Sequence, residues 1–364
     1  MSIFNLQSGI LGRALRNASL LSLSAALFLG AVGCVPQGSG SAGTPSAASA
    51  APASASQAAP APGKLLVGVT QFAAHPSLDN CREGFIEGMK QSGYVEGENV
   101  TFDIQNAQTD SAQAVSIANK FVSNNAALIC GIATPSAVAV ATAIEGTDIP
   151  LVFNAISEPV DVGLIDRLEA PGGQVTGVSD KLPSADQVAL IESLLPDAQT
   201  VGVLYCSSEA SSKAQAQQFE EAAHAAGLEV MILTVASSND IASALDTMLP
   251  KVDCIQNLLD NTIVSALPLV LEKAHGAGKP VFGSEEEQVV NGCVASEGIN
   301  YFDLGVQCGL QAAKILDGAP VSDIPVEVIE QSSLTINPAA IEELGLTLPD
   351  ALRQRAAHIV DTAD

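Results

Sequence analysis

Apolar and polar residues alternate in two different rhythms along most of the chain. From Lys64 onward, short runs of mostly apolar residues, such as Leu65–Val69, are followed by longer stretches in which apolar residues recur every three or four positions. The short runs are typical of buried strands, and the longer stretches are typical of amphipathic helices. Their regular alternation predicts an α/β fold in which parallel sheets are covered by helices.

The pattern of the first half returns in the second half of the chain. One predicted helix in each half ends at a glycine, and four strand-like runs correspond in order. The matching runs are Leu65–Val69 with Thr200–Leu204, Asn99–Ile104 with Leu228–Leu233, Ala127–Cys130 with Val252–Ile255, and Asp148–Phe153 with Gly278–Phe282. The sequence therefore predicts two Rossmann-like lobes that share one topology.

Polar residues gather where the predicted strands end. In open parallel sheets, ligands bind beyond the carboxyl ends of the strands, so two facing lobes would form a cleft that closes on a ligand. The segments expected in this cleft are 71–76, 134–136 and 154–159 from the first lobe and 206–209, 260–262 and 284–287 from the second.

One of these strand-to-helix junctions has the composition of an anion site. Thr134 is a favoured N-cap residue, and Pro135 then falls at the first helical position. The backbone N–H groups of Ser136 and Ala137 would point beyond the strand end, at the positive end of the helix dipole. Alternatively, water or the Thr134 hydroxyl satisfies these donors.

The first 63 residues differ in composition from the rest. Arg13 and Arg16 precede an apolar run at 20–29, as in an export signal, and the chain around Cys34 resembles the end of a bacterial lipoprotein signal. A plain secretory signal is the alternative, since the run is too short to span a membrane. Residues 1–33 are thus expected to be a signal peptide, and 34–63 a disordered Ala/Ser/Pro tether. The protein would be extracytoplasmic and held at the cell membrane only by a lipid on Cys34.

The acidic composition excludes several kinds of partner. The formal net charge is −25, and removal of residues 1–33 would take away two arginines and no acidic residue. Such a surface repels nucleic acid and anionic lipid headgroups. The four histidines are scattered, and none has a cysteine or a second histidine at the spacing of metal ligands. The sequence therefore predicts no metal site, and no cofactor is expected.

Six cysteines remain besides Cys34. An even number in an extracytoplasmic protein permits disulfide bonds. However, Cys130, Cys206 and Cys254 lie within or at the ends of apolar strand-like runs. This placement favours buried free thiols that act as small hydrophobic side chains.

Several short motifs together resemble a known family. They are Gln71–Asp79, Arg82–Phe85, Gly93–Gly97, Gln105–Gln108, Ala133–Pro135, Glu158–Val160, Pro171–Asp180, Asp260–Thr262 and Tyr301–Gly305. With these motifs, the chain after the tether resembles the bacterial ABC transporter substrate-binding lipoproteins linked to tryptophan and other aromatic amino acids, which have the type I periplasmic-binding-protein fold. The resemblance implies a monomeric, non-enzymatic component of an ABC importer that serves a permease and an ATPase.

Folds of this type cross between their two lobes three times. The crossings are expected near Ser179, Ser296 and Val326, so that each lobe is discontinuous in sequence. The N-terminal lobe would comprise 64–179 and 297–325, and the C-terminal lobe 180–296 and 326–364.

The amino-acid ligand that the resemblance implies needs partners for two charges. The donors at the Thr134 junction suit its carboxylate. Its ammonium needs acceptors, and Glu158, Asp180 and Asp260 lie at predicted cleft or hinge positions, with Asn261 next in the chain. Each of these carboxylates has an alternative role as a helix cap.

An aromatic side chain would need ring faces, which are scarce in a chain with no Trp and three Tyr. Phe72, beside Gln71, and Tyr301 are best placed, although Phe72 would equally suit the core. Glu285 and Glu286 lie in a loop that could instead hold a polar or cationic ligand. The identity of the ligand's side chain therefore stays open at this point.

Two other functions use the same cleft. An enzyme would use Glu158 with Asp180 or Asp260 as acid and base, but the sequence has no G-x-S-x-G, H-E-x-x-H or P-loop motif. A sensory lipoprotein would bind the same ligand and pass the signal to a partner instead of a permease.

Overall fold

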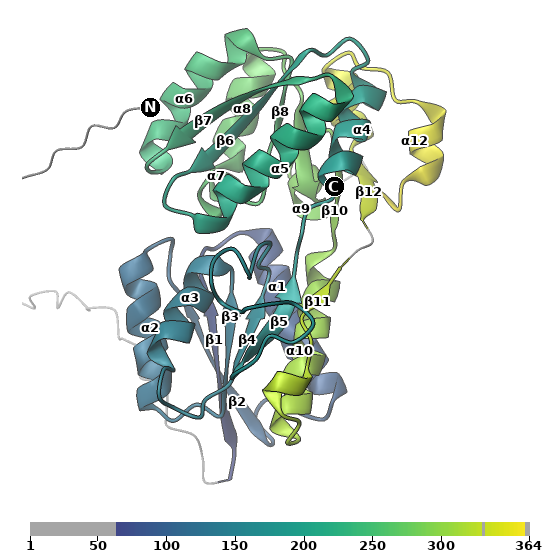
Figure 1. Ribbon diagram of the computed structural model, residues 1–364. Coiled ribbons are helices and arrows are strands. Elements are labelled where there is room, and N and C mark those ends of the chain that lie inside the picture. Colours follow the sequence, from purple (N-terminus) through teal and green to yellow (C-terminus); the bar gives the residue numbers. More distant parts are fainter. Residues whose placement is uncertain (1–62, 330–331, 361–364) are drawn as a thin grey trace, which may run out of the picture. The chain divides into compact units, whose positions relative to one another are not determined.

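The computed structural model describes residues 63–329 and 332–360 (Figure 1). The predicted signal peptide, the lipidation site at Cys34 and the tether up to residue 62 lie outside the described residues. In the described ranges, none of the helices has both the length and the hydropathy that a bilayer span requires.

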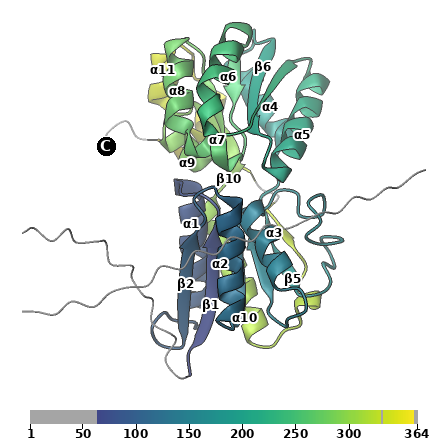
Figure 2. The same ribbon diagram turned by 90° about the vertical axis from the view of Figure 1, so that its left-hand side faces the viewer.

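Six strands form the first sheet, in the order β11-β5-β4-β3-β1-β2, and all neighbours run parallel. They are β1 (Leu65–Gln71), β2 (Val100–Asn106), β3 (Leu128–Ile132), β4 (Leu151–Asn154), β5 (Val175–Ser179) and β11 (Glu327–Val328). Two pairs of helices cover its two faces (Figures 1 and 2). The pairs are α1 (Pro76–Gln91) with α10 (Tyr301–Leu316), and α2 (Ser111–Ser123) with α3 (Thr134–Ala143).

Seven strands form the second sheet, in the order β13-β12-β10-β9-β8-β6-β7. They are β6 (Thr200–Cys206), β7 (Glu229–Val235), β8 (Cys254–Gln256), β9 (Val281–Glu285), β10 (Ala295–Ile299), β12 (Ser333–Ile336) and β13 (His358–Ile359). The helices α4 (Ser184–Leu194) and α5 (Ala210–Ala226) pack together, as do α6 (Ile241–Met248) and α8 (Leu267–Gly276). Shorter helices are α7 (Asn261–Ser265), α9 (Glu286–Val290), α11 (Pro338–Glu343) and α12 (Asp350–Arg355). The predicted α/β fold with two helix-covered sheets is confirmed.

One strand pair departs from the expected parallel arrangement. Strand β12 runs antiparallel to β10. The cause is the direction in which the chain crosses between the sheets: β10 leaves the second sheet toward α10, whereas β12 enters it after β11 of the first sheet. Two neighbouring strands that leave and enter at the same end of a sheet must run in opposite directions.

The strands also show where the chain changes sheets. The first change follows β5, as expected near Ser179, but β10 keeps residues 297–299 in the second sheet and β11 keeps 327–328 in the first. The second and third changes thus come a few residues later than the expected positions. Hydropathy does not reveal these ends, because β10 and β11 are short and the latter is only half-buried. The lobe boundaries as a whole stay a prediction.

The backbones of α1 and α10 approach each other closely at glycines. Gly84 and Gly88 of α1 face Gly305 and Gly309 of α10. A Cβ atom at Gly305 would lie 2.2 Å from the carbonyl oxygen of Cys81, which no real contact allows. Glycine is therefore required at this crossing, which fixes α10 on the first sheet and its first residues at the end of β10.

All six cysteines of the described part are buried and free. The preference for free thiols over disulfide bonds is thereby confirmed. Burial raises the pKa of the Cys254 thiol, so this group stays protonated and packs as a small hydrophobic side chain.

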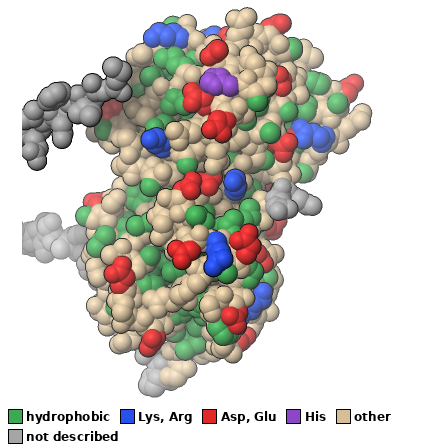
Figure 3. Space-filling view, in the orientation of Figure 1, with side chains coloured by type: hydrophobic (Ala, Val, Ile, Leu, Met, Phe, Trp, Pro, Cys, Tyr) green, Lys and Arg blue, Asp and Glu red, His purple; other side chains and the backbone are tan. Residues whose placement is uncertain are grey.

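Charged side chains are spread over the face of the molecule that Figure 3 shows. Lys and Arg side chains lie singly on this face, among acidic ones, and do not gather into a basic patch. The formal net charge of −25 belongs to the whole chain, and such a charge repels a phosphate backbone.

Candidate ligand-binding site

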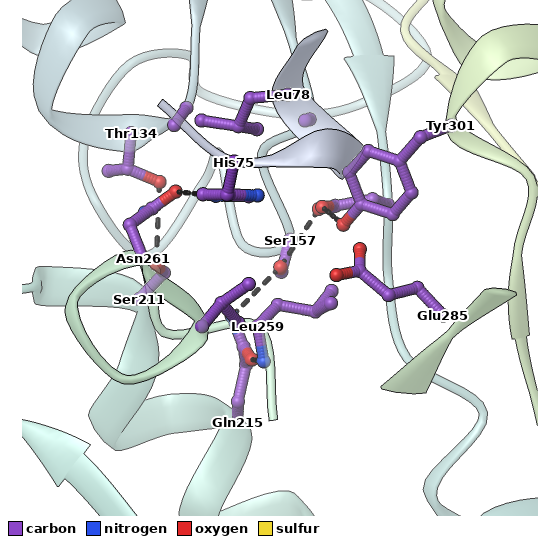
Figure 4. A pocket seen from close by; sticks show the side chains of 14 residues that line it. His75, Leu78, Thr134, Ser157, Ser211, Gln215, Leu259, Asn261, Glu285 and Tyr301 are labelled. Atoms are coloured by element: carbon purple, nitrogen blue, oxygen red, sulfur yellow. Dashed lines mark hydrogen bonds between the residues drawn. The ribbon is translucent and has the colours of Figure 1, made fainter. Parts of the chain in front are cut away.

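A pocket lies at the carboxyl ends of strands from both sheets (Figure 4). Its cavity volume is about 20 Å³ in this conformation, which is room for about one water molecule, so an amino acid would need the lining to move apart. From the first sheet's side it is lined by His75, Leu78, Ala133, Thr134, Ala155 and Ser157, and from the second by Ser211, Gln215, Leu259, Asn261, Val264 and Glu285. Asp180 and Tyr301, which follow the strands where the chain changes sheets, complete it. The predicted placement at strand ends thus brings residues of both sheets to one pocket.

The start of α3 differs by one residue from the expected one. The N-cap is Ala133, with φ 69°, so Thr134 is the first helical residue and its side chain caps no backbone N–H. The prediction of Thr134 as the N-cap was wrong, because alanine in this left-handed conformation has no sequence signal. The Thr134 hydroxyl instead faces the pocket and donates to Ser211 Oγ at 3.4 Å.

The other two donors of this junction have different positions. The Ala137 N–H donates to Ala133 O within the helix at 3.1 Å, which leaves nothing for a ligand. Ser136 is fully buried, and its hydroxyl accepts from Thr70 Oγ1 at 3.4 Å. The first N–H groups of α3, which precede the first intrahelical bond, remain for an anion. The Thr134 hydroxyl could join them if it turned away from Ser211.

Two alanines beside the pocket have strained backbones. Ala133 follows β3 with φ 69°, and Ala155 follows β4 with φ 56°. Both line the pocket. Positive φ in a non-glycine residue costs free energy, and such residues cluster where a ligand must be approached closely.

A buried carboxyl group with two hydroxyl donors lies on one side of the pocket. Asp180 accepts hydrogen bonds from Ser157 Oγ at 2.8 Å and from Tyr301 OH at 2.6 Å. Burial raises the pKa of Asp180, while these two hydroxyl groups act in the opposite direction. A cation beside Asp180 would therefore favour its ionised form.

A second carboxyl group is held across the two sheets. Glu285, at the end of β9, is bonded by the hydroxyl of Ser77 from α1 and by Gln288 Nε2 at 3.0 Å. Burial, together with the charge of Glu287, raises the pKa of Glu285 to about 8. This shift favours the protonated form of Glu285 in this conformation, and protonation lowers the negative charge of the pocket.

The remaining predicted residues lie outside the pocket lining, each for its own reason. Gln71 bonds Asp79 and Arg82, and Phe72 is a core residue, 4% exposed. Asp260 caps α7 by accepting from Ile263 N at 3.0 Å, the alternative role foreseen for it. Glu158 accepts from Gln218 Nε2 of α5 at 2.5 Å.

Several lining residues were given no ligand-binding role by the sequence analysis, and the polar ones among them are His75, Ser157, Ser211 and Gln215. Ser211 and Gln215 are both on α5, beyond the segment 206–209 that was expected in the cleft, and Ser157 lies inside the expected segment 154–159. Gln215 donates to Ser157 Oγ at 3.0 Å and so connects the two sides of the pocket. The four-residue spacing of Ser211 and Gln215 places them on one helix face, which is the signal that could have found them.

The sequence profile of a family described as "ABC transporter substrate binding protein" matches residues 66–360. The chain belongs to this family. Substrate-binding proteins of ABC transporters are extracytoplasmic, and they hold a small molecule. The tyrosine-binding protein of Clostridioides difficile strain R20291 is 38% identical to this substrate-binding protein over 280 residues, which are 77% of this chain and 81% of the relative.

Two solved structures resemble this substrate-binding protein over nearly their whole length. An ABC domain from Streptococcus pneumonia in complex with L-Trp has 38% identity and a TM-score of 0.79, covering 82% of this chain and all of that one. A ligand-free, open substrate-binding protein with adhesive properties from Clostridium difficile has 36% identity and a TM-score of 0.63, covering 81% of this chain and 98% of that one. The resemblance to this family drawn from the sequence motifs is confirmed.

Proposed function

We propose that this protein binds an aromatic amino acid in the pocket and delivers it to an ABC importer. The observation that carries the proposal is the pocket itself, in which carboxyl groups, helix-start donors and apolar side chains line one small space. An α-amino acid offers an ammonium, a carboxylate and a side chain, and the pocket has a partner for each. One relative was solved in complex with L-Trp and another is a tyrosine-binding protein, and each is 38% identical to this chain. These relatives support a ligand with an aromatic side chain.

The proposed pose assigns one part of the pocket to each part of the ligand. The ammonium lies against Asp180 and Glu285, whose oxygens accept hydrogen bonds. The carboxylate lies at the start of α3, where the Thr134 hydroxyl and the positive end of the helix dipole favour an anion. The ring packs against apolar lining residues such as Leu259 and the ring of Tyr301.

The conformation of this chain resembles a ligand-bound relative more than an open one, which supports a mechanism in which the protein closes on its ligand. At nearly equal identity, the TM-score is 0.79 with the Trp-bound relative and 0.63 with the open, ligand-free one. Hydrogen bonds already connect the two sides of the pocket, for example from Gln215 to Ser157. A closed form with these bonds would bury the ligand and present a surface to the permease that the open form lacks.

The proposal includes the setting of the protein. Residues 1–33 would direct export, and a lipid on Cys34 would hold the monomer at the membrane through the tether 34–63. The permease and the ATPase of the importer would be its partners. The protein would catalyse no reaction, since the pocket carboxyls are engaged by hydroxyl and amide donors that suit ligand binding.

The test is a screen of the twenty amino acids against the chain from residue 34 onward, with Cys34→Ser so that no lipid is attached. Thermal unfolding is followed with each amino acid in excess, because a ligand at 100 times its dissociation constant stabilises by about 2.7 kcal/mol. An increase in Tm with one or more of Trp, Tyr and Phe is expected, and recovery of the unchanged amino acid would agree with a non-enzyme. No shift with any amino acid would contradict the proposal.

A further inference from the structure

His75 lines the pocket beside Asn261 (Figure 4). It precedes Pro76, the first residue of α1, and has an extended backbone with φ −154°. Its side chain is 8% exposed and caps no N–H of the helix. The imidazole is therefore held by contacts on the pocket side and not by the helix that it precedes.

A chain of hydrogen bonds fixes how Asn261 presents its amide to His75. Glu209 accepts from Asn261 Nδ2 at 2.6 Å and from the Asn261 N–H at 3.0 Å. The same carboxylate accepts from Thr262 N at 2.8 Å and from Thr262 Oγ1 at 2.9 Å. Because a carboxylate with four donors around it accepts only, the amide nitrogen of Asn261 must face Glu209. Its oxygen then faces His75.

The orientation of Asn261 in turn fixes the tautomer of His75. Asn261 Oδ1 lies 3.3 Å from His75 Nε2, and an amide oxygen there requires that Nε2 carry the proton. Burial lowers the pKa of His75 to about 4, so the ring is neutral at pH 7. A neutral ring with a proton on Nε2 has a bare lone pair on Nδ1, which can only accept.

Nothing in the described ranges 63–329 and 332–360 donates a hydrogen bond to Nδ1 of His75, although this atom is buried. A buried acceptor without a donor is unfavourable by roughly 1–3 kcal/mol, so the site favours an occupant that brings a donor. The ammonium group of an amino acid is not the best donor for His75 Nδ1. It forms stronger hydrogen bonds with the carboxyl groups of Asp180 and Glu285, which line the same pocket.

We propose that the side chain of the ligand donates a hydrogen bond to His75 Nδ1, so that the protein prefers aromatic amino acids with a ring hydroxyl or ring N–H over phenylalanine. This inference rests on the proposed function and narrows it from aromatic amino acids to tyrosine and tryptophan. A phenylalanine ring would bury the lone pair without a donor, and a site built for a donor rejects an analogue that lacks it. His75 acts as a specificity-determining residue and leaves the binding of the ammonium and the carboxylate unchanged.

Isothermal titration of the chain from residue 34 onward, carrying Cys34→Ser, with L-Tyr, L-Trp and L-Phe tests the preference. We expect L-Phe to bind about 10- to 100-fold more weakly than the better of the other two. In His75→Leu, which keeps an apolar side chain but loses the acceptor, this ratio should fall to about 3 or less, chiefly because the tighter ligand is weakened. His224→Leu is the matched control, since His224 lies on α5 outside the pocket lining and is half exposed. Its ratio should equal that of the parent chain.

Nuclear magnetic resonance of the imidazole nitrogens gives a second readout that does not need a folded variant. In the parent chain, the Nδ1 signal of His75 should have the shift of an unprotonated nitrogen and should move upfield with L-Tyr or L-Trp but not with L-Phe. Equal affinity for all three amino acids, or a ratio that His75→Leu leaves unchanged, would overturn the role of His75 while the proposed function stands. If none of the three binds, the proposed function fails.

Discussion

At the scale of single residues, the pocket is a place where burial and hydrogen bonds control protonation. Asp180 and Glu285 are both almost completely buried, yet each is surrounded by donors. Burial raises their pKa values and so favours the protonated form, whereas a cation beside them would lower the pKa values and favour loss of the proton. In the proposed pose, the two residues would thus accept an ammonium group without holding two full charges when the pocket is empty.

Asp180→Asn should weaken binding of the amino-acid ligand about 10- to 100-fold, because a hydrogen bond from an ammonium to a carboxylate becomes one to a neutral amide. The variant should stay folded, since an amide still pairs with the Ser157 and Tyr301 hydroxyls. Titration calorimetry measures the loss, and Asp161→Asn, at an exposed position outside the pocket lining, serves as the control. Equal affinity of Asp180→Asn and the control would remove Asp180 from the proposed ammonium site.

Glu285→Gln should change how stability depends on pH. The pKa of Glu285 is raised to about 8 by burial and by the charge of Glu287, above its model-peptide range. Between about pH 5 and 8 the folded chain therefore holds a proton that the unfolded chain has lost, and stability falls as pH rises through this window, at most by about 1.4 kcal/mol per pH unit. Glutamine resembles the protonated acid but does not titrate, so the Glu285→Gln variant should not lose this stability as the pH rises.

Urea denaturation of the ligand-free chain at pH 5 and pH 8 measures this difference. The gain in unfolding free energy of Glu285→Gln over the parent chain should be larger at pH 8 than at pH 5. A gain that is the same at both pH values would show that Glu285 is ionised in the folded chain throughout.

At the scale of helices and strands, close helix packing determines where pocket residues lie. Tyr301 is the first residue of α10, and α10 is set on α1 by glycines that bring the two backbones together. His75 and Ser77 are at the start of α1. The contact between α1 and α10 therefore fixes the position of Tyr301 relative to His75 and Ser77.

Gly305→Ala should destabilise the chain by about 1–3 kcal/mol, because the added methyl group overlaps the carbonyl oxygen of Cys81 at 2.2 Å and the helices must move apart. Gly276→Ala is the control, since Gly276 is in α8 and a Cβ atom there meets nothing within 4 Å. The control should be neutral or slightly stabilised, as expected for alanine in a helix. Thermal unfolding compares the two, and equal Tm values would contradict the close contact.

The sequence predicted strands and helices well where hydropathy alone decides them. The apolar runs at 65–69 and 200–204 became β1 and β6, and the glycine at 227 ends α5. The sequence failed where packing decides, since the left-handed Ala133 moved the start of α3. For Asp260 the sequence left a ligand contact and a helix cap open, and the residue caps α7. Packing also decides which face of a helix points toward the pocket. For this reason the sequence did not predict that Ser211 and Gln215 line it.

At the scale of the whole chain, the pocket exists because parts of both sheets are joined around it. Some of these connections touch residues that do not line the pocket. Asn80 of α1 donates to Glu287 Oε1 at 2.6 Å, and Gln218 of α5 donates to Glu158 Oε1 at 2.5 Å. All four residues are outside the pocket lining, so these bonds can stabilise the closed form without contacting the ligand.

Removing both bonds should lower affinity through the conformational equilibrium alone. In Asn80→Ala with Gln218→Ala, the closed form loses two hydrogen bonds to carboxylates, each worth roughly 1 kcal/mol when partly exposed, while the open form loses nothing. Because the apparent dissociation constant varies inversely with the fraction of closed chains, about 10-fold weaker binding is expected, with a faster ligand release. Small-angle scattering should show a larger radius of gyration at subsaturating ligand than in the parent chain, and the same radius at saturation.

The exposed Gln113 of α2 gives the control Gln113→Ala, which should match the parent chain. Unchanged affinity and radius in the double variant would mean that closure is stabilised by the ligand and the pocket residues alone.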